Sequence, residues 1–178
     1  IMKALLLAAG FGTRLKPLTD KIPKCLVPIK GKPLLEYWIE NLIHSGINKI
    51  IINTHYKADV VQEFIKNSQY NKNIHVFNEP ELLGTCGTLL ANIENKIEDE
   101  ILLLHSDNYS TQMLNSFIEA HEKRPKNCLL TMMTFNTDTP ETCGIVELKN
   151  KVVVGFHEKV NYSVGNIANG ATYLLSKE

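Results

Sequence analysis

Residues 5–15 read LLLAAGFGTRL, and Pro23-Lys24 follows on the same predicted loop. An apolar run that passes directly into a glycine-rich turn is typical of a buried β-strand followed by a phosphate-binding loop. Glycines let backbone N–H groups approach phosphate oxygens, and the planar guanidinium of Arg14 can bind two such oxygens at once. Lys24 adds a mobile charge that can follow a phosphoryl group as negative charge develops on it. The stretch therefore predicts a site for the triphosphate of a nucleotide.

Two familiar phosphate-binding loops do not fit this stretch. The P-loop ends in Gly-Lys-Ser/Thr, a sequence that occurs nowhere in the chain. The dinucleotide-binding loop needs a third glycine where this chain has Leu15, and a carboxylate after the second strand where residues 53–55 read NTH. A plain strand-to-helix turn would explain the two glycines but not the two cations that share the loop.

Apolar runs alternate with stretches of helical periodicity through the first two thirds of the chain. We expect strands at 3–8, 49–53, 74–78 and 101–104, and helices at 33–45, 58–67, 85–93 and 111–123. Later residues predict a strand at 128–135, a hairpin of 145–148 with 152–157, and a strand at 171–175. The pattern predicts an α/β fold: a doubly wound, mostly parallel, Rossmann-like mixed sheet with helices on both faces.

Length and composition indicate the number of domains and limit the classes of partner that the chain can have. Its 178 residues suffice for one domain with a hydrophobic core, and we expect a single domain over residues 1–178. Formal net charge is zero and the basic residues are dispersed, so we expect no nucleic-acid partner. No apolar run approaches a membrane span and the N-terminus lacks a signal pattern, so we expect a cytoplasmic protein without membrane contact. The sequence leaves the oligomeric state open, a homo-oligomer included.

The cysteines and histidines give weaker signals. The four cysteines show no metal-ligand spacing and indicate reduced thiols rather than disulfides or zinc. Because Cys25 and Cys86 lie within loop motifs, we expect thiol reagents to inhibit the protein. His55, His105 and His157 lie near predicted strand ends at no ligand-like spacing, and we interpret them as ordinary loop histidines.

Asp107 follows the predicted buried strand at 101–104 and a short polar run. The carboxyl ends of parallel strands meet at one edge of a sheet, so we expect Asp107 to lie close to the glycine-rich loop. A single carboxylate there suits Mg²⁺ that bridges phosphates. The alternative is an aspartate that caps the following helix.

Residues 6–37, LLAAGFGTRLKPLTDKIPKCLVPIKGKPLLEY, closely resemble the signature of the sugar-1-phosphate nucleotidyltransferases, nearest to mannose-1-phosphate guanylyltransferases and related uridylyltransferases. The resemblance implies that an NTP and a sugar 1-phosphate form an NDP-sugar and pyrophosphate by Mg²⁺-dependent in-line attack on the α-phosphate. We favour GTP or UTP as the NTP. The resemblance gives Arg14 and Lys24 catalytic roles, on the β- and γ-phosphates and on the α-phosphate respectively. It makes Asp107 a metal ligand, with Ser106 in place of the usual glycine.

The resemblance also implies a set of nucleotide-binding residues, partly from the segment that starts at Glu79-Pro80 and resembles E-P-x-x-L-G-T-x-G. Those residues are Leu7, Ala8, Ala9, Gly10, Gly12, Thr13, Glu79, Gly84 and Thr85. The helix N-terminus in this segment favours nearby negative charge. Plain helix entry is the alternative interpretation of the second glycine-bearing turn.

Four later residues would bind the sugar phosphate by the same resemblance: Gly144, Glu158, Lys159 and Asn169. A hydroxyl-rich, phosphate-bearing acceptor requires a carboxylate and a cation side by side, as in Glu158-Lys159. The alternative for this pair is a solvated charge pair at a strand end. The run that starts at Asn169 has Gly and Ala in swapped order relative to the family's Asn-Ala-Gly-x-Tyr.

Two other functions stay open. A cytidylyltransferase for a non-sugar phosphate such as phosphocholine has a similar amino-terminal signature, but would need an aromatic and acidic cage. The second open function is that of a non-catalytic homologue that binds a nucleotide sugar. The family carries a second metal-binding Asp beyond the Asn-Ala-Gly segment, and the last Asp of this chain is Asp138. We therefore expect a chain that lacks the C-terminal portion of a longer protein.

Overall fold

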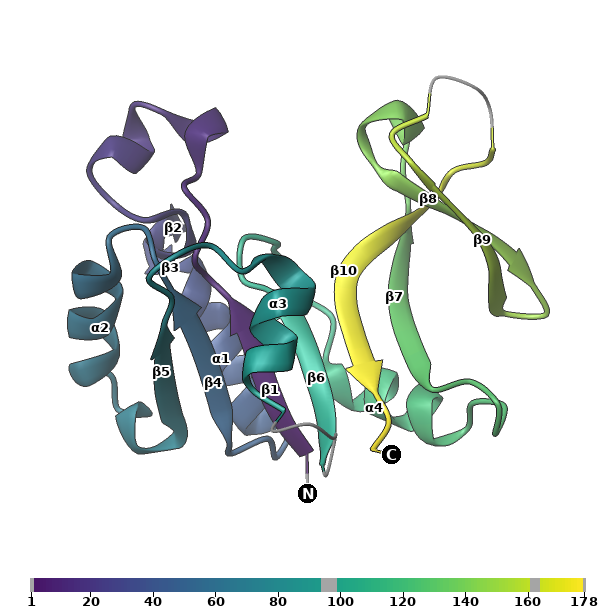
Figure 1. Ribbon diagram of the computed structural model, residues 1–178, viewed down its shortest axis with the longest axis horizontal. Helices are drawn as coiled ribbons and strands as arrows, with labels where there is room; N and C mark the ends of the chain where they lie inside the picture. The colour runs from purple at the N-terminus through teal and green to yellow at the C-terminus, as the bar shows by residue number, and fades with distance from the viewer. Residues whose placement is uncertain (1, 94–98, 161–163, 178) are drawn as a thin grey trace.

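An eight-stranded sheet forms the centre of the molecule in the computed structural model, which describes residues 2–93, 99–160 and 164–177 (Figure 1). Its parallel part has the strand order β5-β4-β1-β6. The bounds of these strands are Met2–Leu7 for β1, Ile50–Thr54 for β4, Ile74–Asn78 for β5 and Glu100–His105 for β6. The predicted parallel sheet is confirmed, and its carboxyl ends lie at one edge.

The sheet continues beyond β6 with antiparallel strands. They are β7 (Leu130–Asn136), β8 (Gly144–Lys149), β9 (Val152–Glu158) and β10 (Ile167–Leu175). The C-terminal half of β10 pairs with β6, its N-terminal half pairs with β8, and β7 pairs with both halves. The predicted β8–β9 hairpin is confirmed. The last strand begins at Ile167 rather than at the predicted residue 171, because β7 and β8 already pair with it there.

Helices cover both faces of the sheet, as predicted. One face packs against α1 (Leu34–His44), α2 (Ala58–Lys66) and α4 (Leu114–Glu122) through a large core cluster, and the other packs against α3 (Gly84–Ala91). Side chains of β1 alternate between the two clusters, with Leu6 on the first and Leu5 on the second. Helix α4 begins at Leu114, later than the predicted residue 111.

The glycine-rich loop between β1 and α1 is folded into three short 3₁₀ turns, Thr13–Leu15, Leu18–Asp20 and Lys24–Leu26. A small hairpin of β2 (Pro28–Ile29) and β3 (Lys32–Pro33) then leads into α1. This loop lies at the upper left of Figure 1, above the ends of the parallel strands, and the β8–β9 hairpin lies at the right of the view. Among the helices of the described residues, none has the length and apolar character needed to cross a membrane.

Candidate functional site

The loops that leave the parallel strands form a first pocket at the carboxyl edge of the sheet. Seven of the predicted nucleotide-binding residues line it, namely Leu7, Ala8, Ala9, Gly10, Glu79, Gly84 and Thr85. They come from the end of β1 and the residues directly after it, and from the stretch that runs from the end of β5 into the first turn of α3. Polar and apolar groups thus converge on a space that opens beside the glycine-rich loop.

A second pocket adjoins the first along the glycine-rich loop. Gly12, Thr13 and Arg14 line it, together with Gly10, Lys24 and Asp107. The last three residues also line the first pocket, so they mark the junction of the two spaces. A nucleoside in the first pocket and a phosphate chain in the second would meet at this junction.

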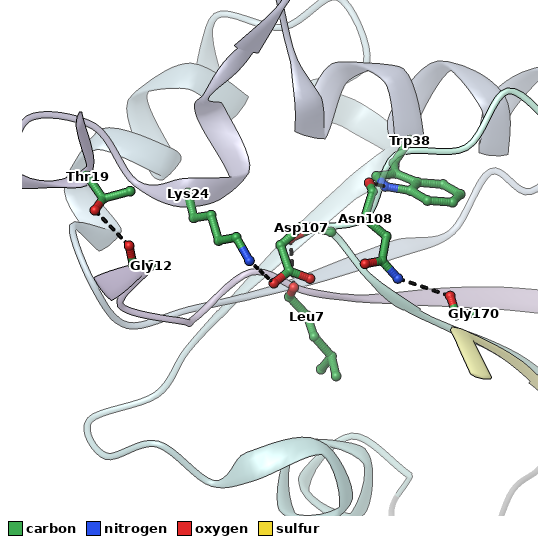
Figure 2. Close-up of polar contacts among 9 residues, drawn as sticks. Leu7, Gly12, Thr19, Lys24, Trp38, Asp107, Asn108 and Gly170 are labelled. Carbon is green, nitrogen blue, oxygen red and sulfur yellow. Dashed lines mark hydrogen bonds and ion pairs between the residues drawn. The ribbon is translucent and has the colours of Figure 1, made fainter. Parts of the chain in front are cut away.

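Lys24 and Asp107 form an ion pair at the junction (Figure 2). Their side chains are 25% and 37% exposed, so both groups remain accessible from the pockets. The pair brings together the predicted α-phosphate cation and the predicted metal carboxylate, which are 83 residues apart in the chain. A cation and a carboxylate in contact where two pockets adjoin can bind a phosphate oxygen and a divalent cation side by side.

Asp107 is positioned by the residue that precedes it. Ser106 is buried, and its N–H and Oγ both donate to the Leu7 carbonyl, at 3.1 and 2.7 Å. The serine that replaces the usual glycine therefore ties β6 to β1. Asp107 does not cap the following helix, because α4 begins at Leu114 and its N-cap is Met113.

The glycine-rich loop has a fixed shape. Gly12 has φ +64, and an added Cβ would lie 2.9 Å from Thr19 Cγ2 and 3.0 Å from Lys24 Cβ. Thr19 Oγ1 donates to the Gly12 carbonyl at 2.8 Å, and Tyr56 Oη donates to the Thr19 carbonyl at 2.9 Å. Only glycine combines this left-handed backbone with such close neighbours, so Gly12 shapes the loop that carries Arg14.

A buried polar network under the first pocket was missed by the sequence analysis. Asn53 accepts a hydrogen bond from the Ala8 N–H at 2.6 Å and donates to Glu79 at 2.9 Å. Glu79 is 1% exposed and also accepts from Thr88 and from the Leu83 N–H. The available signal was a polar Asn directly after the apolar run of β4, at the edge where ligands bind. The network fixes the end of β1 against the start of α3.

The predicted sugar-phosphate residues lie together on the antiparallel strands. Gly144 pairs with Glu158, and an added Cβ at Gly144 would lie 2.7 Å from Glu158 Oε2. Lys159 has φ +49, and its Nζ lies 3.4 Å from Glu158 Oε1, with both side chains more than half exposed. Asn169 is adjacent, since Ala168 pairs with Ile145. In the described part of the chain, none of the four predicted residues lines either pocket above.

The acidic residues of the site suit a metal ion that takes some of its ligands from the protein and the others from a bound substrate. No group of three or more His, Cys, Asp or Glu side chains that could enclose a metal ion occurs within residues 2–93, 99–160 and 164–177. Divalent cations such as Mg²⁺ commonly take one protein carboxylate and complete their shell with water and phosphate oxygens. Asp107 at the junction suits a cation that arrives with a phosphate chain.

The histidines and cysteines near the site are held in different ways. His55 shares a hydrogen bond with the Glu79 carbonyl at 2.8 Å, whereas His105 lines the first pocket, and burial lowers its pKa. All four cysteines are unpaired. Burial raises the pKa of the Cys25 thiol to about 12, while Cys86 is exposed. Of the two loop cysteines, Cys86 is therefore the one that a thiol reagent can reach.

Comparison with known proteins connects this geometry to a family. A family model described as nucleotidyl transferase matches residues 3–178. The chain is 32% identical over 182 residues to mannose-1-phosphate guanylyltransferase 1 of Arabidopsis thaliana, covering 98% of this chain and 50% of that protein. It is 29% identical over 176 residues to D-glycero-alpha-D-manno-heptose 1-phosphate guanylyltransferase of Aneurinibacillus thermoaerophilus, covering 99% and 75%. The chain spans about half the length of the mannose-1-phosphate guanylyltransferases that it matches.

Solved structures show the same fold. A crystal structure of UDP-glucose pyrophosphorylase complexed with UDP-glucose superposes with a TM-score of 0.80 at 21% identity. The match covers 99% of this chain and 76% of that one. The doubly wound sheet with its antiparallel extension is therefore an architecture shared with solved nucleotide-sugar enzymes.

Proposed function

The chain belongs to the nucleotidyl transferase family, and we propose that it joins an NTP and a sugar 1-phosphate into an NDP-sugar with release of pyrophosphate. GTP is the favoured donor, because guanylyltransferases for mannose 1-phosphate and for a heptose 1-phosphate are among its relatives. UTP is the second choice. Both proposed substrates are water-soluble phosphates, which favours a cytoplasmic setting.

The observation that carries this proposal is the junction of the two pockets. Lys24 and Asp107 lie in contact there, between a pocket lined by Glu79, Gly84 and Thr85 and a pocket lined by the glycine-rich loop. The base and ribose would occupy the first pocket, and the β- and γ-phosphates the second. The α-phosphate would then lie beside Lys24.

The proposed reaction needs little proton transfer from the protein. An anionic oxygen of the sugar phosphate attacks the α-phosphorus in line, a new P–O bond forms, and the bond to the β-phosphate bridging oxygen breaks. Lys24 would offset the negative charge that grows on the α-phosphate, and Arg14 would bind the leaving pyrophosphate. When bound by Asp107 and the phosphates, Mg²⁺ would supply further charge neutralisation.

The antiparallel strands would present the acceptor. Lys159 would bind the phosphate of the sugar, and Glu158 and Asn169 would accept or donate hydrogen bonds to its hydroxyls. Gly144 leaves room for the Glu158 side chain against the β8 backbone. This part of the proposal is supported by the proximity of these residues to one another.

A substrate panel tests the proposed function. The chain is incubated with Mg²⁺, each of the four common NTPs and either a sugar 1-phosphate or phosphocholine, and both pyrophosphate release and NTP binding are measured. We expect the highest rate with GTP, and none when the sugar phosphate is omitted. Release only from CTP with phosphocholine would favour the cytidylyltransferase. Binding of NTP without release from any pair would contradict catalysis and favour a non-catalytic homologue.

A further inference from the structure

The peptide group between Gly170 and Ala171 in β10 is held at both ends by asparagine side chains. Its carbonyl, on Gly170, accepts a hydrogen bond from Asn108 Nδ2 at 3.0 Å (Figure 2). Its N–H, on Ala171, donates to Asn169 Oδ1 at 2.9 Å. One asparagine follows the predicted metal ligand Asp107, and the other is the predicted sugar contact.

This peptide has a backbone conformation that needs support. Ala171 has φ +50, a left-handed conformation that an alanine seldom adopts. The pairing register between β10 and β7 shifts between Asn169 and Tyr173, so no regular strand ladder fixes the peptide. An added Cβ at Gly170 would lie 3.0 Å from the Met133 carbonyl oxygen of β7, so a side chain at this position would be crowded. The glycine and alanine that the sequence shows in swapped order thus place the alanine at the left-handed position.

Asn108 is itself fixed on the nucleotide side of the site. Its carbonyl accepts a hydrogen bond from Trp38 Nε1 at 2.8 Å, and Trp38 is only 3% exposed (Figure 2). Its N–H donates to the His105 carbonyl at 3.2 Å. Its backbone is therefore bonded to α1 and to the end of β6, while its side chain reaches β10.

The orientation of the Asn169 amide depends on the same peptide. Asn169 Oδ1 is engaged by the Ala171 N–H, and Asn169 Nδ2 donates to Tyr173 Oη at 2.6 Å. If the peptide rotated, the Ala171 N–H would leave Asn169 Oδ1, and the amide would be held only through Tyr173 Oη. The hydrogen bonds thus form a continuous chain from Asn108 through the peptide to Asn169.

We infer that Asn108 is a positioning residue that couples the loop after β6 to the antiparallel strands, because it holds the Gly170–Ala171 peptide and thereby orients Asn169, the proposed contact to the sugar 1-phosphate. This inference rests on the proposed function, in which Asn169 contacts the acceptor. It assigns Asn108 an effect on the sugar side although its neighbour Asp107 lies on the nucleotide side. A residue that only stabilised the fold would affect both substrates alike.

The test compares two variants that make the same chemical change. Asn108→Asp keeps the side-chain volume but removes the donor to the Gly170 carbonyl. Asn73→Asp is the matched control, because Asn73 Nδ2 also donates to a backbone carbonyl of a distant segment, that of Asn48, at 3.1 Å. We expect Asn108→Asp to raise the KM of the sugar 1-phosphate about tenfold and to leave the KM of the NTP within about twofold.

A rescue variant separates positioning from general damage. Ala171→Gly makes the left-handed conformation unstrained, so the peptide should depend less on Asn108. In the Ala171→Gly background we expect the effect of Asn108→Asp on the sugar-phosphate KM to shrink to about threefold or less. Equal increases in both KM values, or an Asn108→Asp variant that behaves like Asn73→Asp, would overturn the inference.

Amide hydrogen exchange provides a readout that needs no turnover. Asn108→Asp should speed exchange of the Ala171 N–H, while Asn73→Asp leaves it unchanged. Unaltered protection at Ala171 would contradict the inference even in an active enzyme. A chain without pyrophosphate release but with faster Ala171 exchange in Asn108→Asp would instead contradict the proposed function and leave the structural tie supported.

Discussion

The loops that leave the parallel strands are held by buried polar side chains, whereas Glu158 and Lys159, two of the predicted sugar residues, lie exposed at the end of β9. Ser106, Asn53 and Glu79 are each at most 3% exposed, and each bonds to a neighbouring strand or helix. Glu158 and Lys159 are 59% and 62% exposed and contact each other. The nucleotide side thus rests on buried hydrogen bonds, whereas the Glu158-Lys159 pair of the sugar side is exposed to solvent.

This difference agrees with the roles proposed for the two sides, which are transition-state stabilisation on the nucleotide side and substrate binding on the sugar side. Groups that stabilise charge in a transition state must be fixed before the reaction, because any reorganisation would reduce their benefit. Groups that only bind a substrate contribute equally to the ground state and the transition state. Changes on the nucleotide side should therefore lower kcat, and changes on the sugar side should raise KM.

The largest expected effect is that of Lys24→Ala. Removal of one charge-stabilising group typically costs about 100-fold or more in kcat, and Lys24 lies at the junction where the α-phosphate would lie. The measurement is steady-state pyrophosphate release with both substrates saturating. Lys21→Ala, on an exposed residue of the same loop, is the control. Unchanged turnover in Lys24→Ala would exclude Lys24 from the mechanism. It would also contradict the expectation that changes on the nucleotide side lower kcat.

Glu79→Gln should disrupt the buried hydrogen-bond network under the first pocket. A glutamine keeps the volume but offers one acceptor oxygen to Asn53, Thr88 and the Leu83 N–H, so a buried donor is left unpaired. We expect a loss of about 1–3 kcal/mol in the free energy of unfolding, measured with denaturant. The exposed Glu81→Gln should change nothing. If both variants unfold at the wild-type denaturant concentration, the network does not hold the pocket.

Lys159→Ala tests the sugar side of the site. Loss of a solvent-exposed phosphate contact should raise the KM of the sugar 1-phosphate by about tenfold while kcat and the KM of the NTP stay near wild type. Lys151→Ala is a close control, because Lys151 also has a left-handed backbone, φ +64, in the β8–β9 turn. A change in the KM of the NTP alone would mean that the two sides are assigned wrongly.

His121 gives the smallest effect, in the packing of α4 against the antiparallel strands. It is 1% exposed, and its ring contacts Thr131 at 2.7 Å and Ser176 at 3.4 Å. Burial, with the nearby Arg124, lowers its pKa below the ordinary value of 6.5, while Glu100 and Glu122 oppose this shift.

The unfolded chain therefore takes up a proton at a higher pH than the folded one. The stability that His121 contributes is present above about pH 6.5 and falls as the pH drops below it. Denaturant unfolding from pH 8 to pH 5 should show this decline, and His121→Gln should flatten it by an amount below about 1 kcal/mol. The exposed His44→Gln is the control. An equal slope in all three proteins would exclude His121 as its source.

The parallel sheet was predictable because its signals are local. Apolar runs, helical periodicity and the glycine-rich loop each lie within a short stretch, and the comparisons confirm the family that residues 6–37 suggest. The site residues stay a prediction, although the structure brings Arg14, Lys24 and Asp107 to adjoining pockets.

The supporting residues could not be predicted because their partners lie far away in the chain. Ser106 bonds to Leu7, 99 residues earlier, and Asn108 bonds to Gly170, 62 residues later. Nothing in the sequence near Ser106 or Asn108 indicates such a partner. The swap of glycine and alanine after Asn169 was visible, but its consequence, an alanine at φ +50, depends on the pairing of β10 with β7.

In the proposed reaction the nucleotide is attacked at its α-phosphorus, at the junction of Lys24 and Asp107. The most direct measurement follows NTP labelled at the α-phosphorus or at the γ-phosphorus through a reaction with the sugar 1-phosphate that the panel selects. We expect the α label in the sugar nucleotide and the γ label in pyrophosphate. Release of the γ label as orthophosphate, or both labels remaining in the NTP, would contradict the proposed reaction.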